Sequence, residues 1–317
     1  MLRRYRLVAI FSLLGACFLH RLDIYFFSKL SAVLTTEQLV FLGMLTSALI
    51  LLPYVKARKE LREINKMSWK KMFLFLLAVI CGSILSPYFF LGSLKAGSPL
   101  NSVLIITLSP IFVVFFGRVI LKERIRINSL IGGLILMSGV LYVITQGFTL
   151  SNLSITSYEL VIAAVTAALA TILFRVSVYH LSPAVLTFSR CSIGAIIMFV
   201  FVGIIFRENL SSIDWHSLWG LKFELMGFVI LIYIVPNILF FYAIENISAI
   251  SVGLLELSTP IFGVLISVVL LNDSFQSYHV VGVILVVVGL VVTQLRLHRN
   301  KSMVELRASH KVIHPHH

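Results

Sequence analysis

The chain has 317 residues, of which 59% are hydrophobic and only 12% charged, and its formal net charge is +13. Soluble domains usually carry about 25% charged residues, and a chain of this length could not bury so much apolar surface in water. The composition therefore excludes a soluble globular protein and predicts an all-α polytopic membrane protein.

Apolar stretches follow one another along the chain, each close to the roughly 20 residues that cross a bilayer core. We predict ten transmembrane helices, at 7–29, 36–54, 70–93, 98–119, 129–147, 157–180, 184–206, 222–244, 249–271 and 277–296. The connections are short, so a single membrane domain is expected, with no separate soluble domain.

The basic residues gather in alternate connections. Arginines precede the first helix, and Lys or Arg residues follow the second, fourth and tenth helices, whereas 147–156 and 272–276 contain none. Since cytoplasmic loops carry the excess of Lys and Arg, both termini are predicted to be cytoplasmic. Because these charges flank membrane helices, we expect a lipid bilayer as a partner and no nucleic acid. A homodimer stays open.

The N-terminal segment allows a second interpretation, because 14–17 resembles a bacterial lipoprotein cleavage box. Cleavage would leave an odd number of helices, so an uncleaved first helix is favoured. The cysteines Cys17, Cys81 and Cys191 lie inside predicted helices without metal-ligand spacing. No metal and no cofactor are therefore expected. Residues 298–317 are predicted to form a basic, His-rich cytoplasmic tail.

The two halves of the chain repeat each other. A shift of 150 residues places Pro110 on Pro260, Gly132 on Gly282, and Gly139 on Gly289. We predict one five-helix repeat at 1–147 and a second at 157–297. Because five is odd, the second repeat must enter the membrane inverted relative to the first. Inverted repeats are typical of transporters that alternate access to a midplane site.

Each pair of glycines is seven residues apart and so shares one face of a helix, where small residues let a second helix approach closely. Pro110 and Pro260 each remove a backbone hydrogen-bond donor. Either they form a hinge or line a cavity, or they only kink their helices.

The repeated segments at 98–143 and 248–292 resemble the EamA-type members of the drug/metabolite transporter superfamily. Both have a small-residue start, a central proline, an acidic residue that closes the helix (Glu123 and Asp273), and a glycine-containing last helix. The resemblance implies a transporter in a bacterial inner membrane, for a substrate among amino acids, nucleotide-type metabolites, cofactors and drugs. The chain departs from the family pattern at "FLHRLDIYFF" in the first helix.

Two ionisable residues lie at a similar predicted depth inside the membrane, Arg190 in the seventh helix and Glu256 in the ninth. An ionisable side chain there costs about 2.5–3.5 kcal/mol on insertion scales and is a functional candidate. Arg190 would bind a carboxylate or phosphate, and Glu256 an amine or a coupling proton. The alternative is a fixed Arg190–Glu256 ion pair that joins two helices.

Other candidates for substrate binding lie in helices one, three and eight. His20 and Asp23 share a helical face from which Arg21 should point away, unless the helix ends near Leu19 and leaves them in interfacial water. Asn237 follows a proline, where polar groups need partners. The aromatic residues Tyr88 and Tyr233 would stack on a planar substrate or pack in the core.

The sequence contains no HExxH, GxSxG or P-loop motif, so neither an enzyme nor ATP-driven transport is expected. We predict a secondary transporter of a small polar metabolite, an amino acid or related zwitterion, in the export direction and with proton coupling through Glu256. The alternative is uptake or exchange of a nucleotide-like or S-adenosyl metabolite. A membrane enzyme or a channel is less favoured.

Overall fold

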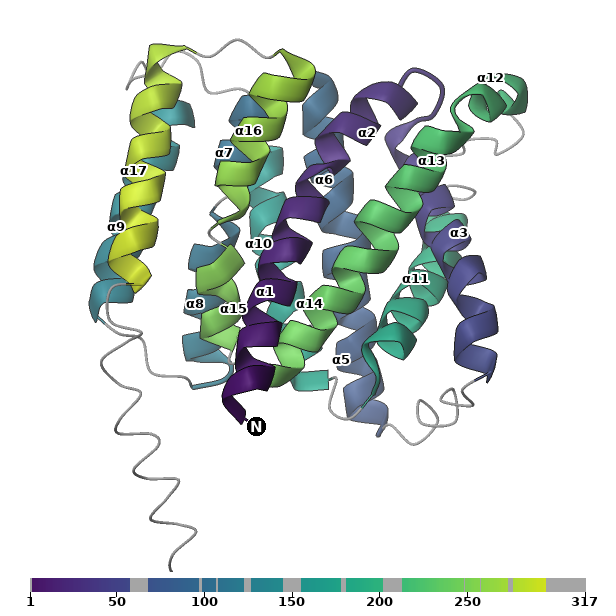
Figure 1. The fold of residues 1–317 in the computed structure, drawn as a ribbon, viewed down its shortest axis with the longest axis horizontal. Helices are drawn as coiled ribbons and strands as arrows, with labels where there is room; N and C mark the ends of the chain where they lie inside the picture. The colour runs from purple at the N-terminus through teal and green to yellow at the C-terminus, as the bar shows by residue number, and fades with distance from the viewer. Residues whose placement is uncertain are drawn as a thin grey trace, which may run out of the picture.

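The computed structural model describes residues 2–57, 68–96, 99–106, 108–122, 127–144, 155–177, 181–201, 213–247, 249–256, 258–272 and 276–294. Within these ranges all regular structure is helical (Figure 1). The predicted acidic positions Glu123 and Asp273, the basic connection at 58–67 and the tail at 298–317 lie outside the described residues.

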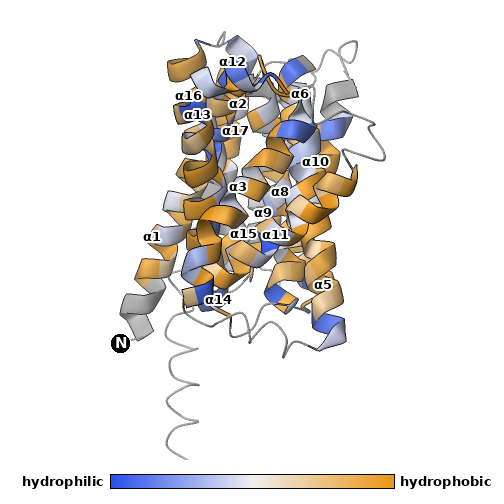
Figure 2. Cartoon of the chain, turned by 90° about the vertical axis from the view of Figure 1, so that its right-hand side faces the viewer, coloured by the Kyte–Doolittle hydropathy of each residue, from blue (hydrophilic) through white to orange (hydrophobic). Residues whose placement is uncertain are grey.

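Long apolar helices dominate the described part of the chain. Six of its spans are long and apolar enough to cross a bilayer, and shorter apolar helices lie near 109–119, 130–139, 262–271 and 277–289. These elements coincide with the predicted membrane segments, which confirms a polytopic all-α membrane protein. The count of ten crossings stays a prediction. In Figure 2 the outer faces are mostly hydrophobic, and hydrophilic residues collect towards the two ends.

Three of the long spans are built from single helices. They are α3 (Thr36–Ala57), α10 (Ile155–Ser177) and α11 (Pro183–Val200). The first span is instead divided at Leu22 into α1 (Leu2–Arg21) and α2 (Asp23–Leu30). A further short helix, α12 (Trp215–Gly220), begins at the N-cap residue Asp214 and was not predicted.

The other two long spans each contain a π-helical turn in their middle. The first comprises α5 (Trp69–Val79), η1 (Ile80–Leu85) and α6 (Ser86–Ala96). The second comprises α13 (Lys222–Phe228), η5 (Val229–Ile234) and α14 (Val235–Asn246). Each π turn is followed within two residues by a proline, Pro87 or Pro236, which has no N–H to continue the helical ladder. Such π turns are frequent at functional sites.

The fourth and ninth predicted helices are not continuous. The fourth divides into α7 (Pro99–Ile106) and α8 (Ser109–Val119), and the ninth into α15 (Ala249–Glu256) and α16 (Thr259–Leu271). Pro110 and Pro260 lie in the first turn of α8 and α16, where a missing N–H costs nothing. Each predicted span is therefore divided in two, and each proline begins a new helix instead of bending an old one.

These two broken helices pack against each other in opposite directions. A side chain at Gly253 of α15 would meet Val113 of α8, and one at Gly263 of α16 would meet Val103 of α7. In Figure 1, α7 and α16 lie in the upper part of the molecule, with α8 and α15 below them. The first half of one helix therefore packs on the second half of its repeat equivalent.

The last predicted helices of the two halves are α9 (Ile127–Ile144) and α17 (Ser277–Gln294), whose bounds differ by 150 residues at both ends. They lie side by side (Figure 1). A Cβ added at Gly139 would lie 2.7 Å from Leu285 Cβ and 3.0 Å from the backbone oxygen of Gly282. Gly139 and Gly282 therefore lie where the two helices approach each other closely. Gly132 and Gly289 are also buried.

Candidate functional site

A cavity of about 240 Å³ lies between the helices and is lined from both halves of the chain. Its lining includes the ionisable residues His20, Arg21, Asp23, Arg190 and Glu256. Asn237, Tyr233 and Pro110 also line it, together with Ser109 and Thr259 from the first turns of α8 and α16. The structure thus brings most of the predicted site residues to one place.

Arg190 binds both halves of the chain at once. From α11 its Nε donates a 2.5 Å hydrogen bond to Ser83 Oγ, and its Nη2 donates one of 3.1 Å to the carbonyl oxygen of Gly82. Its Nη1 donates to Oδ1 of Asn237. Its guanidinium carbon also lies 5.5 Å from the centre of the Phe174 ring. One arginine therefore connects η1 of the first half with α14 of the second.

The π turn explains why Arg190 finds an acceptor at Gly82. The Ser86 N–H bonds the carbonyl of Cys81, five residues earlier, so the next donor in that series would be residue 87. Residue 87 is a proline and has no N–H, which leaves the Gly82 carbonyl without a backbone donor. Arg190 supplies the missing hydrogen bond from another helix. A carbonyl exposed by a broken helix thus becomes part of the site.

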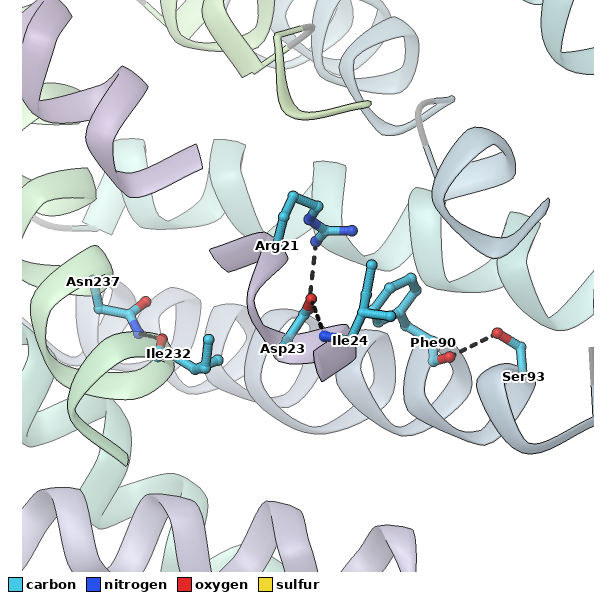
Figure 3. A network of polar contacts seen from close by, with 7 residues as sticks. All are labelled: Arg21, Asp23, Ile24, Phe90, Ser93, Ile232 and Asn237. Atoms are coloured by element: carbon cyan, nitrogen blue, oxygen red, sulfur yellow. Dashed lines mark hydrogen bonds and ion pairs between the residues drawn. The ribbon is translucent and has the colours of Figure 1, made fainter. Parts of the chain in front are cut away.

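Asn237 likewise donates hydrogen bonds to carbonyl oxygens of the second π turn. Its Nδ2 donates to the carbonyl oxygens of Tyr233, at 2.7 Å, and Ile232, at 3.3 Å, while its Oδ1 accepts from Arg190. Asn237 is 2% exposed, so its buried amide finds its hydrogen-bond partners within the protein. Figure 3 shows the contact between Asn237 and Ile232. Because Asn237 also meets Arg190, the two π turns are joined by one hydrogen-bonded chain.

Glu256 is the last residue of α15, at the break that precedes α16. Both Glu256 and Arg190 are described residues, and the ion pair between Arg21 and Asp23 is the one found among the described residues. The structural alternative of a fixed Arg190–Glu256 pair is therefore wrong for this conformation. Arg190 is instead held by neutral oxygens, and Glu256 lines the cavity without that counter-charge.

The polar residues of helix one lie in the cavity wall and not in interfacial water. Asp23 is buried and accepts a 2.9 Å hydrogen bond from the Ile24 N–H (Figure 3). Arg21 Nη2 lies 3.5 Å from Asp23 Oδ2. The prediction that Arg21 points away from Asp23 was wrong, because the helix is interrupted at Leu22 and the regular angular spacing does not carry across it.

Some aromatic residues line the cavity, and others pack against neighbouring side chains. Tyr233 lines the cavity, as do Phe90 and Phe174. Tyr88 is not among the described residues that line it, and its ring lies edge-on to Phe89 at 5.4 Å. The placement of Tyr88 in a substrate site is thus corrected. A side chain that follows a π turn cannot be assigned to a face from α-helical spacing.

Sequence reasoning missed Ser83, Gly82 and the cavity role of Arg21. The signal for Gly82 was the proline at 87, since it frees the carbonyls of the preceding turn, whereas Ser83 takes part through its side-chain hydroxyl. Arg175 of α10 donates to the carbonyl oxygen of Ile244 near the end of α14. A cation there binds the unpaired carbonyls of a helix terminus.

The sequence pattern of the EamA-like transporter family matches this chain twice, at residues 7–145 and 158–295. The chain belongs to the EamA-like transporter family. The two matches cover both halves that contain the broken helices and the π turns. This confirms the family that the sequence resembles.

Several EamA-like relatives carry the name of uncharacterized transporters. One from Synechocystis is 22% identical over 74% of this chain, and one from Methanothermobacter thermautotrophicus is 23% identical over 69%. The transporter YyaM of Bacillus subtilis is 31% identical over 64%. These alignments span 68%, 63% and 66% of the relatives' own lengths. The relatives therefore support a transporter without naming its substrate.

A solved crystal structure has the same fold. It superposes with a TM-score of 0.70 at 17% sequence identity, over 93% of this chain and 99% of the other. At this identity the likeness concerns the fold alone. It extends over nearly the whole chain, so the broken helices lie within an established architecture.

Proposed function

We propose that this EamA-like transporter is a secondary carrier that exports a small zwitterionic metabolite, such as an amino acid, by alternating access and in exchange for protons. The observation that carries the proposal is the cavity, where guanidinium groups and carboxyl groups from both halves surround one space. A zwitterion presents both charges that such a lining would bind.

The size of the cavity supports a small substrate. Its volume is about 240 Å³. Pockets for drug-sized ligands are larger, at about 300–1,000 Å³. A nucleotide-like or S-adenosyl compound would need a wider cavity, so an amino acid or a compound of similar size is the better match.

The arrangement of the helices supports alternating access. Equivalent broken helices of the two halves run in opposite directions, as expected for inverted repeats. Four helix ends meet the cavity at these breaks, including the first turns of α8 and α16. Movement of one half against the other would open this space first to one side and then to the other. We further propose a bacterial inner membrane, with both termini in the cytoplasm.

The proposal is tested in proteoliposomes that contain the full chain and are loaded with a metabolite extract. Mass spectrometry of the external medium identifies compounds that leave these liposomes and not protein-free ones. Release of a zwitterion, accelerated by the same compound outside, is the expected result and also distinguishes a carrier from a channel. If no metabolite is released or exchanged by the wild-type protein, the carrier proposal is overturned.

A further inference from the structure

The cavity contains a second arginine whose hydrogen-bonding state is the opposite of that of Arg190. The guanidinium of Arg190 makes three hydrogen bonds to protein oxygens. Nε and Nη1 of Arg21 are buried and have no hydrogen-bond partner among the described residues. Buried charged donors without partners are rare in folded proteins and need an explanation.

Asp23 does not satisfy Arg21. The two are 3.5 Å apart, which is longer than the 2.7–2.9 Å typical of a charge-assisted hydrogen bond. The other carboxyl oxygen of Asp23 already accepts from the Ile24 N–H. The ring of Phe90 also lies near the guanidinium, 4.9 Å from its carbon, and a ring offers no lone pair. Figure 3 shows Arg21 with Asp23 as its sole marked contact.

The position of Arg21 connects it to the ligand space. It ends α1 at the break before Asp23, and its side chain, 12% exposed, lines the cavity. It also packs against Gly263 of α16, where a Cβ would lie 3.2 Å from Arg21 Cδ. An arginine side chain has several rotatable bonds, so the guanidinium can turn towards an acceptor that enters the cavity.

We propose that Arg21, and not Arg190, is the principal binding group for the oxyanion of the ligand, a carboxylate or a phosphate group. Arg190 is committed to Gly82, Ser83 and Asn237, whereas three of the five N–H donors of Arg21, on Nε and Nη1, have no hydrogen-bond partner in the described residues. A planar fork of donors matches two oxygens of such a group. This inference rests on the proposed function for its substrate class, and it assigns the anionic end of that substrate to helix one.

The test measures ligand binding by the purified full chain, through the rise in melting temperature with ligand concentration. The probes are alanine, succinate and inorganic phosphate, with choline as a cation without an oxyanion. We expect at least one of the first three probes to stabilise the wild-type protein, and its identity distinguishes a carboxylate from a phosphate. In Arg21→Gln the affinity for that probe should fall by about tenfold or more, equivalent to about 1.4 kcal/mol.

Lys29→Gln is the matched control, because it removes one positive charge from the exposed side of the neighbouring α2. Its affinity should stay within about twofold of wild type, since Lys29 does not line the cavity. The inference is overturned if Arg21→Gln binds the oxyanion as well as wild type does. It is also overturned if choline alone stabilises the protein, or if none of the probes does.

A second variant tests whether Nε and Nη1 of Arg21 lack hydrogen-bond partners in the ligand-free protein. The double variant Arg21→Met/Asp23→Asn removes the ion pair without leaving a buried charge, and in the described part of the chain Nε and Nη1 of Arg21 have no hydrogen bond to lose. Its melting temperature without ligand should therefore equal or exceed that of wild type. A decrease as large as that of Arg190→Met would overturn the inference. If oxyanion binding depends on Arg21 while no metabolite is exchanged, this site stands and the carrier proposal fails. If exchange proceeds unchanged in Arg21→Gln, the carrier proposal stands and this site fails.

Discussion

Nε of Arg190 on α11 donates a 2.5 Å hydrogen bond to Ser83 Oγ on η1, although the two residues are 107 positions apart in the sequence. The same guanidinium also reaches Asn237 behind the second π turn. The contact therefore connects the interrupted helix of one half to the interrupted helix of the other. A rearrangement that separates the two π turns must break it.

Arg190→Met should lower the free energy of unfolding by roughly 3 kcal/mol, because it leaves three protein oxygens without their charged donor. The loss can be measured by thermal or denaturant unfolding in detergent. Ser83→Ala removes one of the three bonds and should cost about 1 kcal/mol. Equal stability of Arg190→Met and wild type would contradict the role of Arg190 as a connection between the halves.

Asn237→Ala should also destabilise the protein, since Nδ2 no longer serves the carbonyls of Ile232 and Tyr233. The effects of Asn237→Ala and Arg190→Met should not add, with a coupling of about 1 kcal/mol between them in a double-mutant cycle. Asn246→Ala is the control: its Nδ2 donates to the Tyr242 carbonyl on the exposed part of α14. Additive losses at 237 and 190 would show that the two side chains act independently.

The sequence sufficed to predict the membrane segments and the family, because both depend on apolar runs and on residues in register over 150 positions. It also sufficed for Arg190, Glu256 and Asn237 as cavity residues, since buried polar groups in lipid are rare and face the interior. In each of these cases a local pattern carries the information.

The sequence did not suffice to predict side-chain directions where a helix departs from regular α-helical spacing. Arg21 was assigned to the wrong face because the interruption at Leu22 resets the angle, and Tyr88 because a π turn precedes it. The partners of Arg190 could not be deduced either, since one of them is the backbone carbonyl of Gly82. The division into repeats at 1–147 and 157–297 stays a prediction.

The close approach of α9 and α17 predicts a strong effect of a single methyl group. Gly139→Ala would place Cβ 2.7 Å from Leu285 Cβ and 3.0 Å from the Gly282 oxygen, so the helices must separate. We expect a loss of about 1–3 kcal/mol in unfolding free energy. Gly133→Ala, on the same helix with nothing within 4 Å, should cause no loss. Similar results for the two variants would argue against tight packing at Gly139.

The short helix α12, outside the membrane spans, should respond to pH. A hydrogen bond from the Ser217 side chain, followed by that from its N–H, lowers the pKa of Asp214. The ionised Asp214 cap therefore stabilises α12 fully at pH values above the ordinary pKa of aspartate. This stabilisation is lost as the pH falls through the lowered pKa of Asp214. Hydrogen-exchange protection of 215–220 should decrease in acid. Asp214→Asn, which keeps a capping oxygen without the charge, should show little pH dependence; an identical acid response in both would refute this.

Glu256→Gln tests proton coupling at the break between α15 and α16. The amide has nearly the shape of the carboxyl but cannot release and rebind a proton, so transport driven by a pH gradient should disappear. Exchange of the substrate across the membrane without a gradient should persist, because the cavity and Arg21 are unchanged. Glu245→Gln is the matched control, since Glu245 is exposed on α14 and does not line the cavity. Gradient-driven transport that survives in Glu256→Gln would assign the coupling proton to another group, and loss of both activities would make Glu256 a substrate-binding residue.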